Sequence, residues 1–343
     1  MSTSIERDIG IFTKKTTSNK MERRKFNKSL GIFSFATLMG CKTTECANKN
    51  NVNPNLSNES SDNHSRYQIS LAQWSCHRML QNGQLDNLEF AGFAGNLGFT
   101  GVEYVSRFLE AGLTDTSYWN KMNEVAKKAE VQQLLIMTDL TGSLGALSKE
   151  DRQFAIDEHI PWIYAAKALG CHSIRVNLWG EGTKTEQREK CTESLASLAA
   201  IGADYGQNII VENHGGYSSD AKWLSQIMND INMPNCGTLP DFGNFCIARE
   251  GGEKWGTPCI EKYDRYLGVE ELMPYAKAVS AKSHAFDKQG NESSTNFTKM
   301  MKIIHDSDFE GFIGVEWEGD GISETAGIKA TKALIERTIA AIK

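Results

Sequence analysis

The sequence predicts an α/β fold, a single (β/α)8 TIM barrel, from three observations. From residue 67 onward, short apolar runs alternate with longer segments of helical periodicity, and the alternation occurs eight times. Parallel sheets made of strand–helix units give this pattern. The span 67–343 also exceeds the roughly 250 residues that such a barrel needs. The segment after the first strand lacks the glycine-rich phosphate loop that is typical of the alternative, an open doubly wound sheet.

The predicted strands are short apolar runs that recur along the chain. They cover residues 68–74, 101–105, 132–138, 173–179, 208–213, 237–242, 278–284 and 312–317. Helical patterns cover 85–98, 116–130, 192–206 and 323–343, and several of them close on Gly, as helix C-termini commonly do. The connection 246–268 after the sixth strand is long, and extended loops at this face of a barrel often cover the site. Cys246 and Cys259 share this loop and are a candidate disulfide in an oxidising compartment.

The composition is that of a folded protein without a nucleic-acid surface. Of its 343 residues, 40% are hydrophobic, which is enough apolar material for a large core. The net charge of −6 argues against a scaffold that neutralises phosphates, so we expect no nucleic-acid partner. The 8 Cys are too few for a disulfide scaffold in a chain of this length. No apolar run reaches the roughly 18–20 residues that span a bilayer.

Residues 1–41 are predicted to be a leader that carries an export signal. Arg23 and Arg24 begin a pattern that resembles the twin-arginine motif, and the apolar run at 30–40 has the length of a signal-peptide core. The tetrapeptide that ends at Cys41 resembles a bacterial lipobox, whose Cys is lipidated. We therefore expect an exported lipoprotein, anchored at Cys41, that faces the periplasm or the cell surface. The alternative is a cytosolic amphipathic arm.

The residues on either side of this signal are polar. The stretch 1–20 is unusual ahead of a signal, and translation from Met21 is an alternative start. Residues 42–66 are rich in Asn, Ser, Thr and Glu and hold almost no large apolar side chains. Such a segment cannot bury enough surface to fold, so we expect a flexible tether. Residues 67–343 then form the barrel domain.

Four residues at the ends of consecutive predicted strands carry the candidate chemistry. They are Glu212, Asp241, His284 and Glu316. In a barrel, side chains at the C-terminal strand ends point into the mouth, and neighbouring strands lie about 4.8 Å apart, so the four can converge on one point. Three carboxylates and one imidazole suit one divalent metal ion, such as Mn²⁺, Co²⁺, Mg²⁺ or Zn²⁺. Each residue alone is as well explained as a solvated rim residue or a helix cap.

Further residues at or near the strand ends are candidates for contacts with a substrate. They are His77, Glu103, Trp179, His214 and Lys282. Each also has a structural explanation. Either His can be a hydrogen-bonded rim residue, Glu103 can form an ion pair inside the sheet, and Trp179 can belong to the core. Lys282 lies two residues before His284 and can be a charge partner below it.

Four blocks of sequence carry a resemblance to a known family. They are IIVENHGG (209–216), PDFGNF (240–245), MPYAKAVSAKSHAFDKQGNE (273–292) and GFIGVEWEG (311–319). Through these blocks the span 67–343 resembles the xylose isomerase-like TIM barrels, which include sugar phosphate isomerases and epimerases, and in particular an exported branch. The resemblance implies that Glu212, Asp241, His284 and Glu316 are metal ligands. It also implies that Glu212 and Glu316 act as the acid–base pair.

Two positions depart from the family pattern. Many relatives have a His three residues after the Asp, which helps to bind substrate, and here that position is Asn244. Many also have a Lys between the metal-binding His and the next Asp, whereas here Phe286 precedes Asp287. We keep Asn244 as a candidate substrate contact. Both departures are expected to bear on the substrate more than on the metal.

The resemblance implies an isomerase or epimerase that removes a proton next to the carbonyl of a small carbohydrate. The metal stabilises the enediolate charge while one Glu removes the proton and the other returns one. If the adjacent carbon carries a leaving group, the same step makes the enzyme a lyase on 3-keto-glycosides. Export favours free or keto sugars over sugar phosphates. The alternatives are a non-catalytic carbohydrate-binding lipoprotein and an abasic-DNA nuclease, which the acidic charge disfavours. Assembly into a homo-oligomer stays open.

Overall fold

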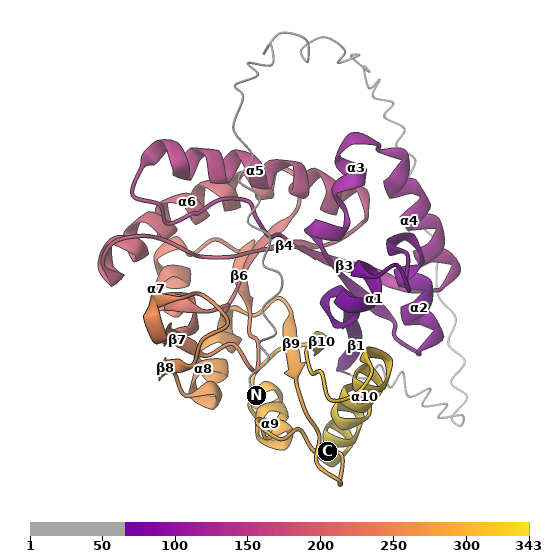
Figure 1. Cartoon of the computed structure of the whole chain (residues 1–343). Helices are drawn as coiled ribbons and strands as arrows, with labels where there is room; N and C mark the ends of the chain where they lie inside the picture. Colours follow the sequence, from indigo (N-terminus) through magenta and orange to yellow (C-terminus); the bar gives the residue numbers. More distant parts are fainter. Residues whose placement is uncertain (1–65, 343) are drawn as a thin grey trace, which may run out of the picture. The chain divides into compact units, whose positions relative to one another are not determined.

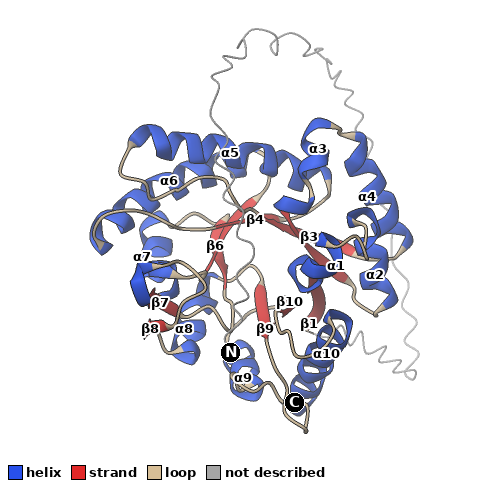
Figure 2. Ribbon diagram, in the orientation of Figure 1, coloured by secondary structure: helices blue, strands red, loops and turns tan. Residues whose placement is uncertain are grey.

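Eight parallel strands form the inner layer of the protein, and helices surround them (Figure 2). The computed structural model describes residues 66–342. Neighbouring strands are hydrogen-bonded in the order β6-β5-β4-β3-β2-β1-β10-β9, which confirms the predicted (β/α)8 barrel. The predicted leader 1–41 with its lipid anchor at Cys41, and nearly all of the predicted tether 42–66, lie outside the described residues.

Strands and helices alternate along the chain, and the helices are arranged around the strands (Figure 1). The strands of the barrel are β1 (Tyr67–Ala72), β2 (Gly101–Val105), β3 (Gln132–Met137), β4 (Ser173–Val176), β5 (Asn208–Glu212), β6 (Cys236–Leu239), β9 (Val279–Ser283) and β10 (Gly311–Trp317). The helices are α1 (His77–Gln81), α2 (Phe90–Asn96), α3 (Glu110–Thr114), α4 (Ser117–Lys128), α5 (Lys149–Ala168), α6 (Lys184–Asp204), α7 (Ala221–Ile231), α8 (Arg265–Leu272), α9 (Phe297–Asp306) and α10 (Glu324–Ala341). Within residues 66–342, no helix is both long and apolar enough to cross a membrane.

The ring of strands closes between β6 and β9. Thr238 of β6 bridges to Ala276, and Asp241, just after β6, bridges to Ser280 of β9. The backbone N–H of Ser280 donates to the carbonyl of Pro240, and that of Phe242 donates to the carbonyl of Ser280. This closure places Asp241 beside the middle of β9.

The interior of the barrel is apolar at one level and polar at the next. A small apolar cluster fills it, made of Ala72, Val105, Leu135, Met137, Ile210, Leu239 and Ala278. Side chains alternate between the two faces of a strand, so Glu212 points to the same side as Ile210, and Glu103 to the same side as Val105. Both carboxyl groups are buried, as are Arg175 and Lys282. Charged groups are therefore enclosed next to the apolar cluster.

Several strands end earlier than the apolar runs predict. β4 ends at Val176, so Asn177 and Trp179 lie in the loop that follows it. β9 ends at Ser283, so His284 lies just beyond the strand. The long predicted loop contains an antiparallel ribbon of β7 (Cys246–Arg249) and β8 (Cys259–Lys262), which the sequence pattern does not predict.

Candidate active site

Three buried carboxyl groups meet at the C-terminal ends of β5, β6 and β10. Glu212 is the last residue of β5, Asp241 follows β6, and Glu316 lies near the end of β10. One carboxylate oxygen from each of the three lies within 4.8 Å of the others. The residues are only 1%, 0% and 4% exposed, respectively. These three residues, together called the carboxylate group, could hold a metal ion. Their oxygen-only ligands suit hard ions such as Mg²⁺ or Mn²⁺.

His284, the fourth expected ligand, does not belong to the carboxylate group. The side chain is exposed beyond the end of β9. Ser280, in the middle of β9, lies beside the carboxylates instead. The hydroxyl oxygen of Ser280 is 2.9 Å from Oδ2 of Asp241 and 2.7 Å from Oε2 of Glu316. Three of the four predicted ligands therefore lie together in the part of the chain that the structure describes, and His284 is not among them.

Lys282 places a positive charge among these acids. Its Nζ lies 3.2 Å from Oε1 of Glu318, 3.4 Å from Oε1 of Glu316 and 3.7 Å from Oδ2 of Asp241. The side chain is only 2% exposed. Burial alone would lower the pKa of Lys282, but the neighbouring carboxylates outweigh it and raise the pKa well above its usual range. The ammonium therefore stays charged at neutral pH.

A second buried cation, Arg175, pairs with the remaining acid of the carboxylate group. Nε of Arg175 lies 2.9 Å from Oε2 of Glu212, although the N–H direction does not meet the oxygen as a hydrogen bond. The other end of the guanidinium lies 3.3 Å from Oδ1 of Asp139 and donates to Oδ1 of Asn177 at 3.1 Å. Asn244 completes the surroundings of Glu212, since its Nδ2 donates to Oε1 at 3.0 Å. Glu212 is thus held on both oxygens.

Two acids of the site, Glu212 and Asp241, have pKa values close to neutral pH. Burial raises the pKa of Glu212 to about 8, against the opposing effect of Arg175. Burial likewise raises the pKa of Asp241 to about 7, against the opposing effect of Lys282. Groups that gain and lose protons near neutral pH are suited to general acid–base catalysis.

A cavity of about 760 Å³ opens above the carboxylate group, within the range of small-molecule sites. Glu316 lines it, whereas Glu212 and Asp241 are not among its lining residues. Four of the predicted substrate contacts also line it: Trp179, His214, Asn244 and Lys282. A larger hollow of about 960 Å³ is lined by residues of α8 and α9 instead. The smaller cavity is therefore the candidate substrate site.

His77 and Glu103, the other two predicted substrate contacts, do not line the cavity. Nδ1 of His77 lies 2.7 Å from the carbonyl oxygen of Trp74, and the two rings stack 4.7 Å apart. Glu103 accepts a hydrogen bond of 2.6 Å from Ser70, and burial raises its pKa to about 7. Gly314 packs against this carboxyl group, because a Cβ there would lie 2.5 Å from Oε1 of Glu103. His77 is thus hydrogen-bonded, as the sequence allowed, whereas Glu103 is held by the hydroxyl of Ser70 and not by the ion pair that the sequence allowed.

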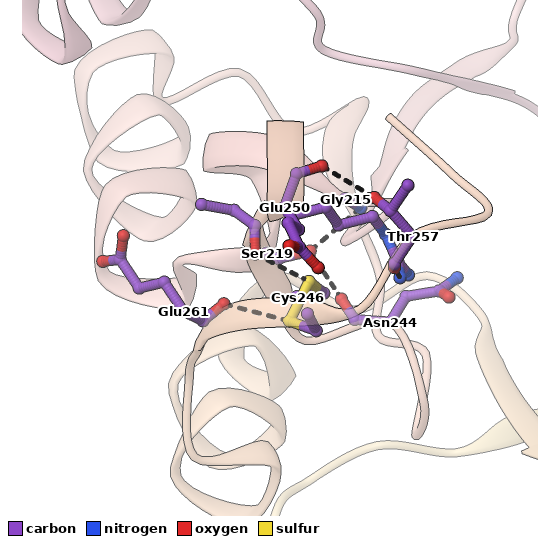
Figure 3. The surroundings of a disulfide bond; sticks show 10 residues. Gly215, Ser219, Asn244, Cys246, Glu250, Thr257 and Glu261 are labelled. Carbon is purple, nitrogen blue, oxygen red and sulfur yellow. Dashed lines mark hydrogen bonds between the residues drawn. A yellow bond between two sulfur atoms is a disulfide. The ribbon is translucent and has the colours of Figure 1, made fainter. Parts of the chain in front are cut away.

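The β7–β8 ribbon covers one side of the cavity and is closed by a disulfide. Cys246 and Cys259 are bonded, which confirms the predicted pair, and Figure 3 shows the bond close to Asn244. Trp255, between the two strands, lines the cavity with its ring 4.8 Å from that of His214 and 6.0 Å from that of Trp179. The predicted lid is therefore an ordered ribbon with an aromatic tip.

Sequence reasoning overlooked several residues of this site. Arg175 and Ser280 both lie inside predicted strands, where a polar residue interrupts an apolar run. Period-two alternation relates Ser280 to Lys282 and assigns both to the interior face of β9, so the pattern contained a signal for them. Arg107 lies in a short 3-10 helix after β2, and Glu318 lies in the loop after β10. Both also line the cavity, and neither had such a signal in the sequence.

These features define a (β/α)8 barrel with a buried acidic site at the mouth formed by the C-terminal strand ends. A family model described as xylose isomerase-like TIM barrel matches residues 92–340. The chain belongs to this family. None of the curated proteins matches the sequence.

Solved structures of low sequence identity share the fold. The structure of the IOLI protein with a bound zinc atom has a TM-score of 0.61 and 12% identity, and the match covers 80% of this chain and 99% of that one. D-psicose 3-epimerase from Clostridium cellulolyticum H10, solved with D-tagatose, has a TM-score of 0.60 and 10% identity, covering 79% and 99%. 3-Keto-D-glucoside 4-epimerase (YcjR) from E. coli has a TM-score of 0.56 and 13% identity, covering 74% and 94%.

Proposed function

We propose that this protein is a sugar isomerase or epimerase that removes a proton next to a carbonyl group. The observation that carries the proposal is Glu316, a buried carboxylate that lines the cavity, together with Glu212, a neighbouring acid whose pKa is raised. Family membership supports an enzyme of this class, and two solved relatives are sugar epimerases. The substrate class is a small carbohydrate.

The two glutamates have unequal access to a substrate. Glu316 faces the cavity and is the group that removes the proton. Glu212 is held by Arg175 and Asn244 and is the partner that returns one, after these contacts open. Each such transfer contributes roughly 10²–10⁴-fold to the rate. Return to the same carbon gives epimerisation, and return to the neighbouring carbon gives isomerisation.

A divalent ion belongs to this proposal, with Glu212, Asp241 and Glu316 as the residues that would hold it. When bound, such an ion supplies positive charge to the oxygens of a hydroxy-carbonyl pair. The protein supplies the rest of the site: Asn244 and His214 reach hydroxyl groups, and Trp179 and Trp255 provide flat apolar surface for a sugar ring.

A lyase on 3-keto-glycosides is the second candidate, because the same proton removal expels a leaving group from the adjacent carbon. The E. coli relative is a 3-keto-D-glucoside 4-epimerase, and this substrate class favours the lyase. We also propose that the protein is an exported lipoprotein anchored at Cys41, on the strength of the twin-arginine-like and lipobox-like patterns in residues 1–41.

Incubation with a panel of ketoses, inositols and 3-keto-glycosides in D₂O, with Mn²⁺ present, tests the reaction. We expect deuterium at a carbon next to the carbonyl, and release of an aglycone would select the lyase. Glu316→Gln should lower the rate of deuterium incorporation at least 10²-fold in protein whose circular dichroism spectrum shows that it is folded. The matched control is Glu336→Gln on the exposed face of α10, which should be unaffected.

A protein that only binds carbohydrate gives a different result. Such a protein keeps its affinity for a sugar after Glu316→Gln. Neither the unaltered protein nor the variant then catalyses deuterium incorporation into the sugar. That pair of results would contradict the proposed reaction while leaving the fold and the cavity as described.

A further inference from the structure

We propose that the ammonium group of Lys282 is the resident cation of this site, and that it competes with a divalent ion for Asp241 and Glu316. This competition sets the charge balance of the site and is separate from the proposed reaction. Measurements of ion binding test it, whether or not the protein turns over a sugar.

The first observation is that Lys282 shares its carboxylate partners with the candidate ion. Asp241 and Glu316 are two of the three acids that could hold a metal, and Nζ of Lys282 lies 3.7 and 3.4 Å from their oxygens. The third acid, Glu212, already has Arg175 at 2.9 Å. All three carboxylates therefore have a cationic partner supplied by the protein itself.

The second observation is that Lys282 is fixed in this position. Its side chain is 2% exposed, and its stem packs against Gly243, where a Cβ would lie 3.1 Å from Cδ of Lys282. Glu318 holds the ammonium from outside the carboxylate group, with Oε1 at 3.2 Å. Lys282 thus has an anchor that a divalent ion at the three acids would not use.

The third observation is the space that is left between the acids. Divalent ions bind carboxylate oxygens at about 2.0–2.6 Å, so an ion held by Asp241 and Glu316 would lie close to an ammonium that contacts the same two side chains. Like charges at such separation repel strongly in a buried site. Ion binding must therefore displace Lys282 or tolerate this repulsion, and either outcome weakens the affinity.

Lys282 also lines the cavity, so its ammonium group can contact a substrate as well as exclude a metal ion. Without an ion, it is a positive charge that a substrate oxygen can reach beside Glu316. Loss of a residue that supports metal ligands typically costs about 10–100-fold in affinity. Lys282 opposes the ion instead, so we expect its removal to strengthen ion binding by a factor of the same order.

Calorimetric titration with Mn²⁺ alone tests the proposal on the chelator-treated protein. Lys282→Met should bind Mn²⁺ about 10–100-fold more tightly than the unaltered protein, and should gain more thermal stability from it. The matched control is Lys277→Met, an exposed lysine just before β9, which should leave the affinity unchanged. Adding Asp241→Asn to the Lys282→Met protein should abolish the gain, because the ion is bound at the carboxylate group.

Glu318→Gln provides a second variant, which decides the question if Lys282→Met does not fold. If Glu318 anchors Lys282, this change should strengthen Mn²⁺ binding, because the ammonium is then held less firmly. A direct role of Glu318 as a metal ligand predicts the opposite. Mn²⁺ affinity that is unchanged or weaker in Lys282→Met would overturn the proposal, and so would the same result in Glu318→Gln if Lys282→Met does not fold.

Discussion

The hydroxyl group of Ser280 lies 2.7 Å from Oε2 of Glu316, and it also lies 2.9 Å from Oδ2 of Asp241. A hydroxyl carries one hydrogen, so it donates to only one of these carboxyl groups at a time. The other must hold a proton itself or rely on Lys282. Ser280 therefore couples the protonation of two acids on neighbouring strands.

Removal of this hydroxyl should destabilise the fold. Ser280→Ala removes the hydroxyl that donates to one of two buried carboxylates, so we expect the free energy of unfolding to fall by about 1–3 kcal/mol. Urea denaturation in the presence of a chelator measures the change. The control is Ser197→Ala, whose exposed hydroxyl donates to a carbonyl within α6. A similar loss in both variants would show that the position of Ser280 is unimportant.

The stability of the metal-free protein should decrease as the pH rises from about 6.5 to about 8. The folded-state pKa of Glu212 is raised to about 8, and those of Asp241 and Glu103 to about 7, so these groups hold protons that the unfolded chain has released. Their contribution is complete below their ordinary pKa values and is lost as the pH rises through the raised ones.

Buried histidines act in the opposite direction, but at lower pH. Burial lowers the pKa of His214 well below its ordinary value, and that of His159 to about 4. Their effect is therefore complete above the ordinary His pKa of about 6.5. Urea denaturation at pH 6.5, 7.3 and 8 isolates the acids. The decrease should be smaller in Glu212→Gln, and an increase in stability over this range would contradict the assignment.

The aromatic tip of the ribbon should contribute to substrate binding. Trp255→Ala removes a ring that lines the cavity next to Trp179 and His214. Such contacts are worth about 0.5–1.5 kcal/mol, so KM should rise roughly 2- to 13-fold while kcat stays unchanged. The control is Phe154→Ala on α5, an exposed ring that does not line the cavity. A fall in kcat alone would instead implicate the ribbon in the chemical step.

Reduction of the disulfide should loosen the ribbon without unfolding the barrel. Cys246 and Cys259 join β7 to β8, and the segment between them carries Lys254. We expect trypsin to cleave after Lys254 faster in the presence of a reductant, because local opening becomes easier. The double variant Cys246→Ser/Cys259→Ser should be cleaved at the faster rate with or without reductant. Equal rates for the oxidised and reduced protein would show that the ribbon is held by its packing.

Much of the architecture was predictable because strand periodicity is a local property. The predicted strand 101–105 coincides with β2, and the eight apolar runs correspond to the eight strands of the barrel. Parallel strands place their C-terminal ends on one side, and this rule is sufficient to bring Glu212, Asp241 and Glu316 together. The pairing of Cys246 with Cys259 was predictable because both lie in one loop, with a sequence separation of 13.

The charge partners of these acids depended on the tertiary structure. His284 lies just beyond the end of β9 and is exposed, whereas Ser280 and Lys282 lie within β9 and are buried. The pairing of Arg175 with Glu212 depends on the register of β4 against β5. Periodicity predicts which way a side chain points. The energy of a buried charge depends instead on the charged groups that lie near it on other strands. The sequence alone therefore determined the barrel and its acidic mouth, and only the tertiary structure decided which cations neutralise it.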